Sequence, residues 1–198
     1  MIVIDPDLDP DPAATVKKNS TTLVPDITER RRRLPSARTL SRFLTTAQAA
    51  VRMRGQVTVL LTTDQAIRGL NRRFRGKNKA TDVLSFPAGG PVAGDVAGDL
   101  AISVPTALRQ AAEQGHALSV EIKVLMLHGL LHLAGFDHET DEGQMARRER
   151  LLRARLRLPQ GLIERSNTPQ KQLSKRRSPR QSATTRPASK RAMRGARS

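Results

Sequence analysis

The sequence contains no cysteine, tryptophan or tyrosine, and only 4 phenylalanines. Without cysteine, disulfides and thiolate metal sites are excluded, so a bound metal would have to use His, Asp or Glu. The scarcity of aromatic residues argues against nucleic-acid recognition through rows of stacked rings. No apolar run approaches the roughly 20 residues that cross a bilayer, and the acidic N-terminal segment resembles neither a secretory signal nor a transit peptide. We therefore predict a soluble, cytoplasmic protein without a membrane segment.

Positive charge is abundant and unevenly distributed. The formal net charge is +17, and residues 165–198 hold 11 of the 35 Lys and Arg residues and no acidic residue. Residues 1–164 therefore carry 24 basic and 18 acidic residues, a net charge of +6. The composition predicts one domain over 1–164 and a disordered basic tail over 165–198. The charge favours a polyanionic partner such as nucleic acid, with solubility as the plainer alternative.

Alternating and helical apolar patterns predict the secondary structure of this domain. In the helix predicted at 64–74, Asp64 is the expected cap, and Ile67, Leu70 and Phe74 share one side. We expect strands at residues 1–5, 56–62, 82–87 and 98–104, and helices at 35–53, 64–74, 105–112, 118–134 and 141–157. This order predicts an α/β (α+β) fold, in which helices pack on a small mixed sheet.

Three of the four histidines lie within eleven residues, in the stretch HGLLHLAGFDH that begins at His128. His128 and His132 are four residues apart, so one face of a helix presents both imidazoles to one cation. Gly135 then favours a left-handed helix end, and that reversal can bring His138 back as a third ligand. Three protein ligands with one open position are typical of catalytic zinc sites. His116 lies outside the cluster and is expected at the surface.

The spacing of these histidines is shared with zinc proteases, but one residue differs. Those enzymes have the motif H-E-x-x-H, in which the glutamate is the general base. Here that position is Gly129, which cannot accept a proton. The pattern therefore predicts a protease-like metal site with a different chemistry.

A second cluster is strongly basic and precedes the strand at 82–87. The segment NRRFRGKNKATDVLSFP, residues 71–87, contains five cationic side chains at a predicted helix end and loop: Arg72, Arg73, Arg75, Lys77 and Lys79. Arginine can donate paired hydrogen bonds to a phosphate and stabilise charge that develops there. The cluster therefore indicates a phosphate-binding site, although cations also favour helix C-termini for purely structural reasons.

Together, HGLLHLAGFDH, the upstream FRGKNKATDVLSFP and GDLAIS between them resemble the YbeY family of bacterial rRNA-maturation endoribonucleases, over about residues 40–157. The resemblance implies one zinc ion on His128, His132 and His138, and a catalytic role for Arg75. It also implies cleavage of single-stranded RNA in 3′-end maturation of small-subunit rRNA and in ribosome quality control. The implied partners are rRNA, the ribosome or its small subunit, and assembly factors.

Several alternatives stay open at the level of sequence. The general base is a metal-activated water, Asp137 or Glu121, and Asp137 is better suited to orienting a histidine ligand. A zinc hydrolase of another substrate class is a second interpretation, with the absent glutamate at 129 counting against a peptidase. A third is a ribosome assembly factor without catalysis, whose zinc is structural and closed by a fourth protein ligand.

Overall fold

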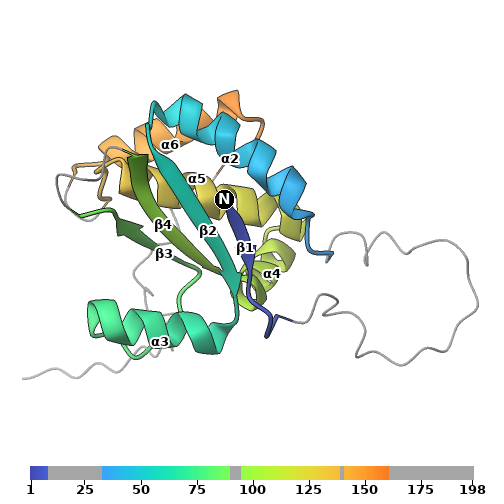
Figure 1. Cartoon of the computed structure of the whole chain (residues 1–198). Coiled ribbons are helices and arrows are strands. Elements are labelled where there is room, and N and C mark those ends of the chain that lie inside the picture. The colour runs from blue at the N-terminus through green and yellow to red at the C-terminus, as the bar shows by residue number, and fades with distance from the viewer. Residues whose placement is uncertain (9–32, 90–94, 139–140, 161–198) are drawn as a thin grey trace, which may run out of the picture. The chain divides into compact units, whose positions relative to one another are not determined.

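The computed structural model describes residues 1–8, 33–89, 95–138 and 141–160 (Figure 1). The predicted tail at 165–198 and its predicted disorder lie outside these residues, as does the whole segment 9–32. The strands are β1 (Ile2–Ile4), β2 (Gln56–Thr62), β3 (Val83–Pro87) and β4 (Val96–Ser103). The helices are α2 (Ala37–Val51), α3 (Asp64–Arg75), α4 (Val104–Glu113), α5 (Leu118–Leu133) and α6 (Gln144–Arg155).

The four strands form one mixed sheet in the order β1-β2-β4-β3. β1 pairs with β2 and β2 with β4 in parallel, whereas β3 pairs with β4 in antiparallel orientation. This confirms the predicted fold class. The order makes β3 an edge strand, and the candidate site lies at that edge.

Helices cover the two faces of the sheet unequally. Leu100 and Ile102 of β4 join the main hydrophobic core with α2 and α5, while Ala101 between them packs with Ile67 of α3. Because successive side chains of a strand point to opposite faces, α5 and α3 lie on opposite faces. Figure 1 shows α2, α5 and α6 grouped together and α3 apart from them.

Helix α5 is buried around most of its circumference, and ten of its 16 residues are buried. A helix that is apolar on all sides is typical of a core element. The buried surface of α5 therefore extends well beyond a single apolar stripe. The buried helix gives the histidines near its C-terminal end a rigid support.

Two details of the predicted boundaries were wrong. The cap of α3 is Thr63, whose hydroxyl oxygen accepts a hydrogen bond from the N–H of Ala66 at 3.2 Å, and Asp64 is the first helical residue. The Asp64 carboxylate instead accepts hydrogen bonds from the Thr106 hydroxyl at 2.7 Å and from Arg109 at 3.0 Å. Asp64 thus connects α3 to α4. Strand β4 begins two residues earlier than expected, because a register shift next to Gln56 lets it pair further along β2.

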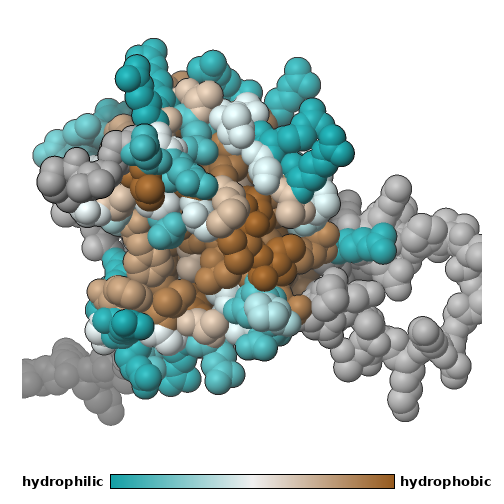
Figure 2. All heavy atoms as spheres, viewed as in Figure 1, coloured by the Kyte–Doolittle hydropathy of each residue, from teal (hydrophilic) through white to brown (hydrophobic). Residues whose placement is uncertain are grey.

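Apolar side chains are exposed near β1 and β2 (Figure 2). Val3 and Ile4 of β1 are 37% and 41% exposed. Among the helices described above, none combines the length and apolar character that a membrane span requires. The exposed apolar surface lies toward the β1 edge, away from the strand that borders the site.

Gly98 is the tightest point of the sheet, and we expect its substitution to destabilise the domain. Its φ is +142°, and a Cβ there would lie 2.4 Å from the Phe86 carbonyl oxygen and 2.9 Å from Leu133 Cδ2. Gly98→Ala should therefore lower the free energy of unfolding by about 3 kcal/mol, measured by urea denaturation. Gly89→Ala is the matched control, because nothing lies within 4 Å of a Cβ at that position. Equal effects of the two substitutions would contradict this account.

Candidate metal centre

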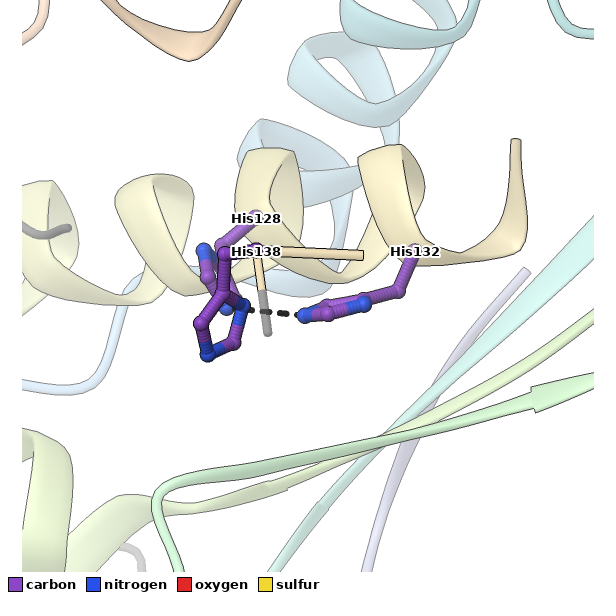
Figure 3. Close-up of side chains that lie close together, drawn as sticks. All are labelled: His128, His132 and His138. Carbon is purple, nitrogen blue, oxygen red and sulfur yellow. Dashed lines mark hydrogen bonds between the residues drawn. The ribbon is translucent and has the colours of Figure 1, made fainter. Parts of the chain in front are cut away.

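Three histidines converge at the C-terminal end of α5 (Figure 3). His128 and His132 project from successive turns of α5, and Gly135, two residues beyond the end of the helix, has a φ of +88°. There the N–H of Gly135 donates to the carbonyl of His132 at 3.0 Å, and the next N–H donates to the carbonyl of Leu131 at 3.1 Å. This turn reverses the chain and places His138 beside the other two rings.

The spacing of the three rings suits a shared cation. One ligand atom from each of His128, His132 and His138 can be chosen so that all lie within 4.8 Å of one another. The Nε2 atoms of His128 and His132 are 3.2 Å apart, and two nitrogens at tetrahedral positions around one zinc are about 3.3 Å apart. His138 Nδ1 is buried and has no hydrogen-bond partner among the described residues. The cluster could therefore hold a metal ion.

The electrostatics keep one of these imidazoles neutral. Burial lowers the pKa of His132 to about 4, and the neighbouring His128 and His138 act in the same direction, while the charge of Asp137 opposes them. At neutral pH this ring is unprotonated, so a lone pair is available for a cation. Within the described part of the chain, no fourth His, Asp or Glu belongs to the cluster.

A buried carboxylate on α6 orients His128, and sequence reasoning missed it. The Oε2 atom of Glu149 lies 3.1 Å from Nδ1 of His128, and its other oxygen pairs with Arg153. Burial alone would raise the pKa of Glu149, but His128 and Arg153 outweigh this effect and lower it. An ionised Glu149 accepts a hydrogen bond from Nδ1–H of His128, so the lone pair of His128 lies on Nε2, toward the cluster.

We expect Glu149→Gln to weaken metal binding by about 10- to 100-fold, because the amide no longer holds the tautomer of His128 as firmly. The measurement is metal affinity by competition with a chromogenic chelator. Thermal unfolding of the metal-free variant reports separately on the weakened pairing with Arg153. Glu113→Gln, at the exposed end of α4, is the control. A normal affinity in Glu149→Gln would reduce Glu149 to a structural role.

A cleft of about 1050 Å³ opens beside the cluster at the β3 edge of the sheet. His128, His132 and His138 line one side of it. The C-terminal end of α3 and the loop after it contribute Arg75 and Lys77. The other three cations of the basic cluster are not among the described residues that line the cleft. The fold thus brings together the histidine cluster and part of the basic cluster.

Two residues lie elsewhere than the sequence indicated. His116 is not a surface residue, because its side chain is only 14% exposed and its Nε2 lies 2.5 Å from Glu121. Glu121 is fully buried and does not line the cleft, so it is excluded as the general base. It lies seven residues, about two helical turns, before His128 on α5. Asp137, the other carboxylate considered, lines the cleft.

Comparison with known proteins shows the family of this chain. The family model described as Endoribonuclease YbeY matches residues 26–157. An Endoribonuclease YbeY from Koribacter versatilis is 54% identical over 142 residues, which cover 72% of this chain and 91% of that protein. One from Solibacter usitatus is 50% identical over 126 residues, covering 64% of this chain and 83% of the relative. The chain belongs to the YbeY family. The solution structure of TM1509 from Thermotoga maritima aligns with a TM-score of 0.45 and 27% identity, covering 62% of this chain and 85% of that one.

The YbeY match spans every residue of the site described above. It includes the basic cluster, the three histidines and Glu149 on α6. The tail at 165–198 lies beyond it. Membership of the YbeY family is therefore shown for residues 26–157 and gives no role to the tail.

The structure supplies a packing reason for Gly129 in this YbeY chain. A Cβ on Gly129 would lie 2.7 Å from Leu100 Cδ2 and 3.2 Å from Ser85 Oγ. The Ser85 hydroxyl also donates to the Gly129 carbonyl at 3.3 Å. Position 129 therefore faces the sheet and contributes to the close contact of α5 with β3 and β4. A glutamate there would meet the sheet before it could reach the cleft.

Proposed function

We propose that this YbeY-family chain is a zinc-dependent endoribonuclease that cleaves single-stranded RNA. We further propose that it acts in the cytoplasm, in 3′-end maturation of small-subunit rRNA and in ribosome quality control. Its partners would be rRNA, the ribosome or its small subunit, and assembly factors. The observation that carries the proposal is the cleft that Arg75 and the three histidines share.

His128, His132 and His138 would hold one zinc ion. Neutral imidazoles suit zinc, whereas magnesium and calcium prefer oxygen ligands. A zinc ion bound there supplies Lewis acidity to a phosphate oxygen and lowers the pKa of a water molecule. The three-ligand set leaves room for substrate, which supports a catalytic over a structural ion.

Arg75 would bind the scissile phosphate and neutralise the charge that grows on it during cleavage. As the last residue of α3, it contributes a positive charge to the lining of the cleft that the three histidines share. Lys77 adds a second cation to the same lining. Asp137 acts on His132 through its charge, so we assign it an orienting role toward the ligands.

Two phenylalanines support a preference for single strands. The rings of Phe74 and Phe86 form an edge-to-face pair with centroids 5.1 Å apart, and both line the cleft. Phe74 is 57% exposed although it is large and apolar. Unpaired bases can stack on such rings, whereas bases within a duplex cannot.

The basic tail would add a sequence-independent hold on rRNA. Its 11 cationic residues are not offset by any acidic residue. Deleting 165–198 should weaken RNA binding and flatten its dependence on salt, because fewer counterions are released from the RNA. Binding titrations over a series of salt concentrations measure this slope. An unchanged slope would assign the tail to solubility alone.

The deciding experiment combines metal analysis of the purified protein with cleavage assays on single-stranded and duplex RNA, with and without chelator. We expect close to one zinc per chain, cleavage of the single strand, and its loss on chelation with recovery on added zinc. Bound zinc without cleavage would favour the non-catalytic assembly factor. Cleavage that survives complete metal removal would contradict the proposed mechanism.

A further inference from the structure

We propose that a second basic groove, formed by α2, α5 and the end of α6, binds the phosphate backbone of RNA outside the cleft. The groove has a volume of about 460 Å³. Cationic side chains dominate its lining: Arg38, Arg42, Lys123, Arg155 and Arg157. The inference rests on the proposed function, because it concerns how the same RNA is held.

The groove concentrates positive charge that nothing in the described chain neutralises. No acidic residue is among its lining, and none of the five cations forms an ion pair with another described residue. Lys123 instead lies over the ring of Phe43, 5.8 Å from its centroid. Five like charges around one hollow repel one another, and a polyanion removes that cost.

The groove is separate from the metal cleft, and the two share no lining residue. Lys123 precedes His128 by five residues on α5, which turns the two side chains about 140° apart around the helix axis. Helices α2, α5 and α6 group together in Figure 1, so the three elements that form the groove are neighbours. An RNA longer than the cleft can therefore contact a second basic surface on the same domain.

The lining favours RNA phosphates over an acidic protein segment. Four of the five cations are arginines, whose planar guanidinium groups can donate two hydrogen bonds to one phosphate. Arg38 lies in the first turn of α2, where the helix dipole adds positive potential. Protein partners usually bind through apolar anchors in pockets, and Phe43 and Leu156 are the only large apolar residues of this lining.

The test compares two charge-matched double variants of the full-length protein. The groove variant is Arg42→Gln with Arg155→Gln, both exposed residues of the lining. The control is Arg54→Gln with Arg150→Gln, two exposed arginines that line neither the groove nor the cleft. Affinity for a long single-stranded RNA is measured by fluorescence anisotropy in chelator, which prevents cleavage, over a series of salt concentrations.

We expect the groove variant to bind long RNA about tenfold more weakly, with a log–log salt slope smaller by about 1.4, because two phosphate contacts are lost. The control should bind with an affinity within about twofold of that of the unmodified protein, since its arginines lie outside both basic surfaces. The groove variant should still cleave a short RNA at the normal rate, because neither substituted residue lines the cleft.

Three outcomes would overturn the groove assignment. Equal losses in both variants would mean that only net charge matters. Normal RNA binding by the groove variant, together with loss of binding to poly-glutamate, would assign the groove to acidic protein segments. Weaker cleavage of short and long RNA alike would place Arg42 or Arg155 in the substrate cleft. If the unmodified protein neither binds nor cleaves RNA, the proposed function itself fails, which is distinguishable from all three.

Discussion

Replacing His132 with alanine will remove tight metal binding and RNA cleavage while leaving the domain folded. The substitution leaves two imidazoles where three converge, and two ligands hold zinc far more weakly than three. The Lewis acidity that the ion supplies is worth several kcal/mol, so cleavage should fall on the order of 10³-fold or more. The measurements are zinc per chain by elemental analysis and the initial rate on single-stranded RNA.

The fold should tolerate this change because the side chain stabilises the metal-free protein little. His132 is only partly buried, and its ring contacts are with the other two histidines of the cluster. Its remaining interactions are with the neighbouring Phe136 backbone and the charge of Asp137. His116→Gln is the matched control, since it alters the one histidine outside the cluster and keeps a hydrogen-bonding group beside Glu121. A His132→Ala protein with normal zinc content and normal cleavage would remove the cluster from the mechanism.

The parts of the site that depend on local sequence could be predicted. Helical spacing gives His128 and His132 a common face, and Gly135 gives the helix end its left-handed turn. These features follow from a few neighbouring residues. The bounds of β2 were also predicted correctly, because QVTVLLT is a short run rich in residues that favour strands.

Contacts between distant segments could not be predicted in the same way. Glu149 reaches His128 across 21 positions of sequence, and a charged helix such as α6 looks solvent-exposed when taken alone. A partial signal was nonetheless present, because Met145 and Leu152 lie seven residues apart, at helical spacing, and indicate a face of α6 that packs against the core. Glu149 and Arg153 lie on the same face, and all four residues are buried.

The burial of His116 and Glu121 had no comparable signal. They are five residues apart, on either side of the start of α5, and their pairing depends on the turn between α4 and that helix. The position of β4 between β2 and β3 likewise follows from packing rather than from element order. It is this order that makes β3 an edge strand and opens the cleft beside it.

Replacing Arg75 with alanine will leave zinc binding intact and lower the cleavage rate about 10²- to 10³-fold, the usual cost of removing one fixed charge from a developing anion. Arg75 is an exposed residue at the C-terminal end of α3, so its loss costs little stability. The effect should appear in kcat more than in KM, because the charge it neutralises grows only in the transition state. Steady-state cleavage of single-stranded RNA by zinc-loaded protein measures both constants.

Two further substitutions make this prediction specific. Arg72→Ala removes an equal charge from the same helix turn, but that residue does not line the cleft, so cleavage should stay near normal. Arg75→Lys keeps the charge but loses the planar guanidinium group that donates paired hydrogen bonds. Its cleavage rate should therefore lie between those of the alanine variant and the unmodified protein. If Arg72→Ala and Arg75→Ala lower cleavage equally, the basic cluster acts only through its general field and Arg75 has no place at the reacting phosphate. The same conclusion would follow from a normal kcat in Arg75→Ala, because the cleft would then need no cation at the end of α3.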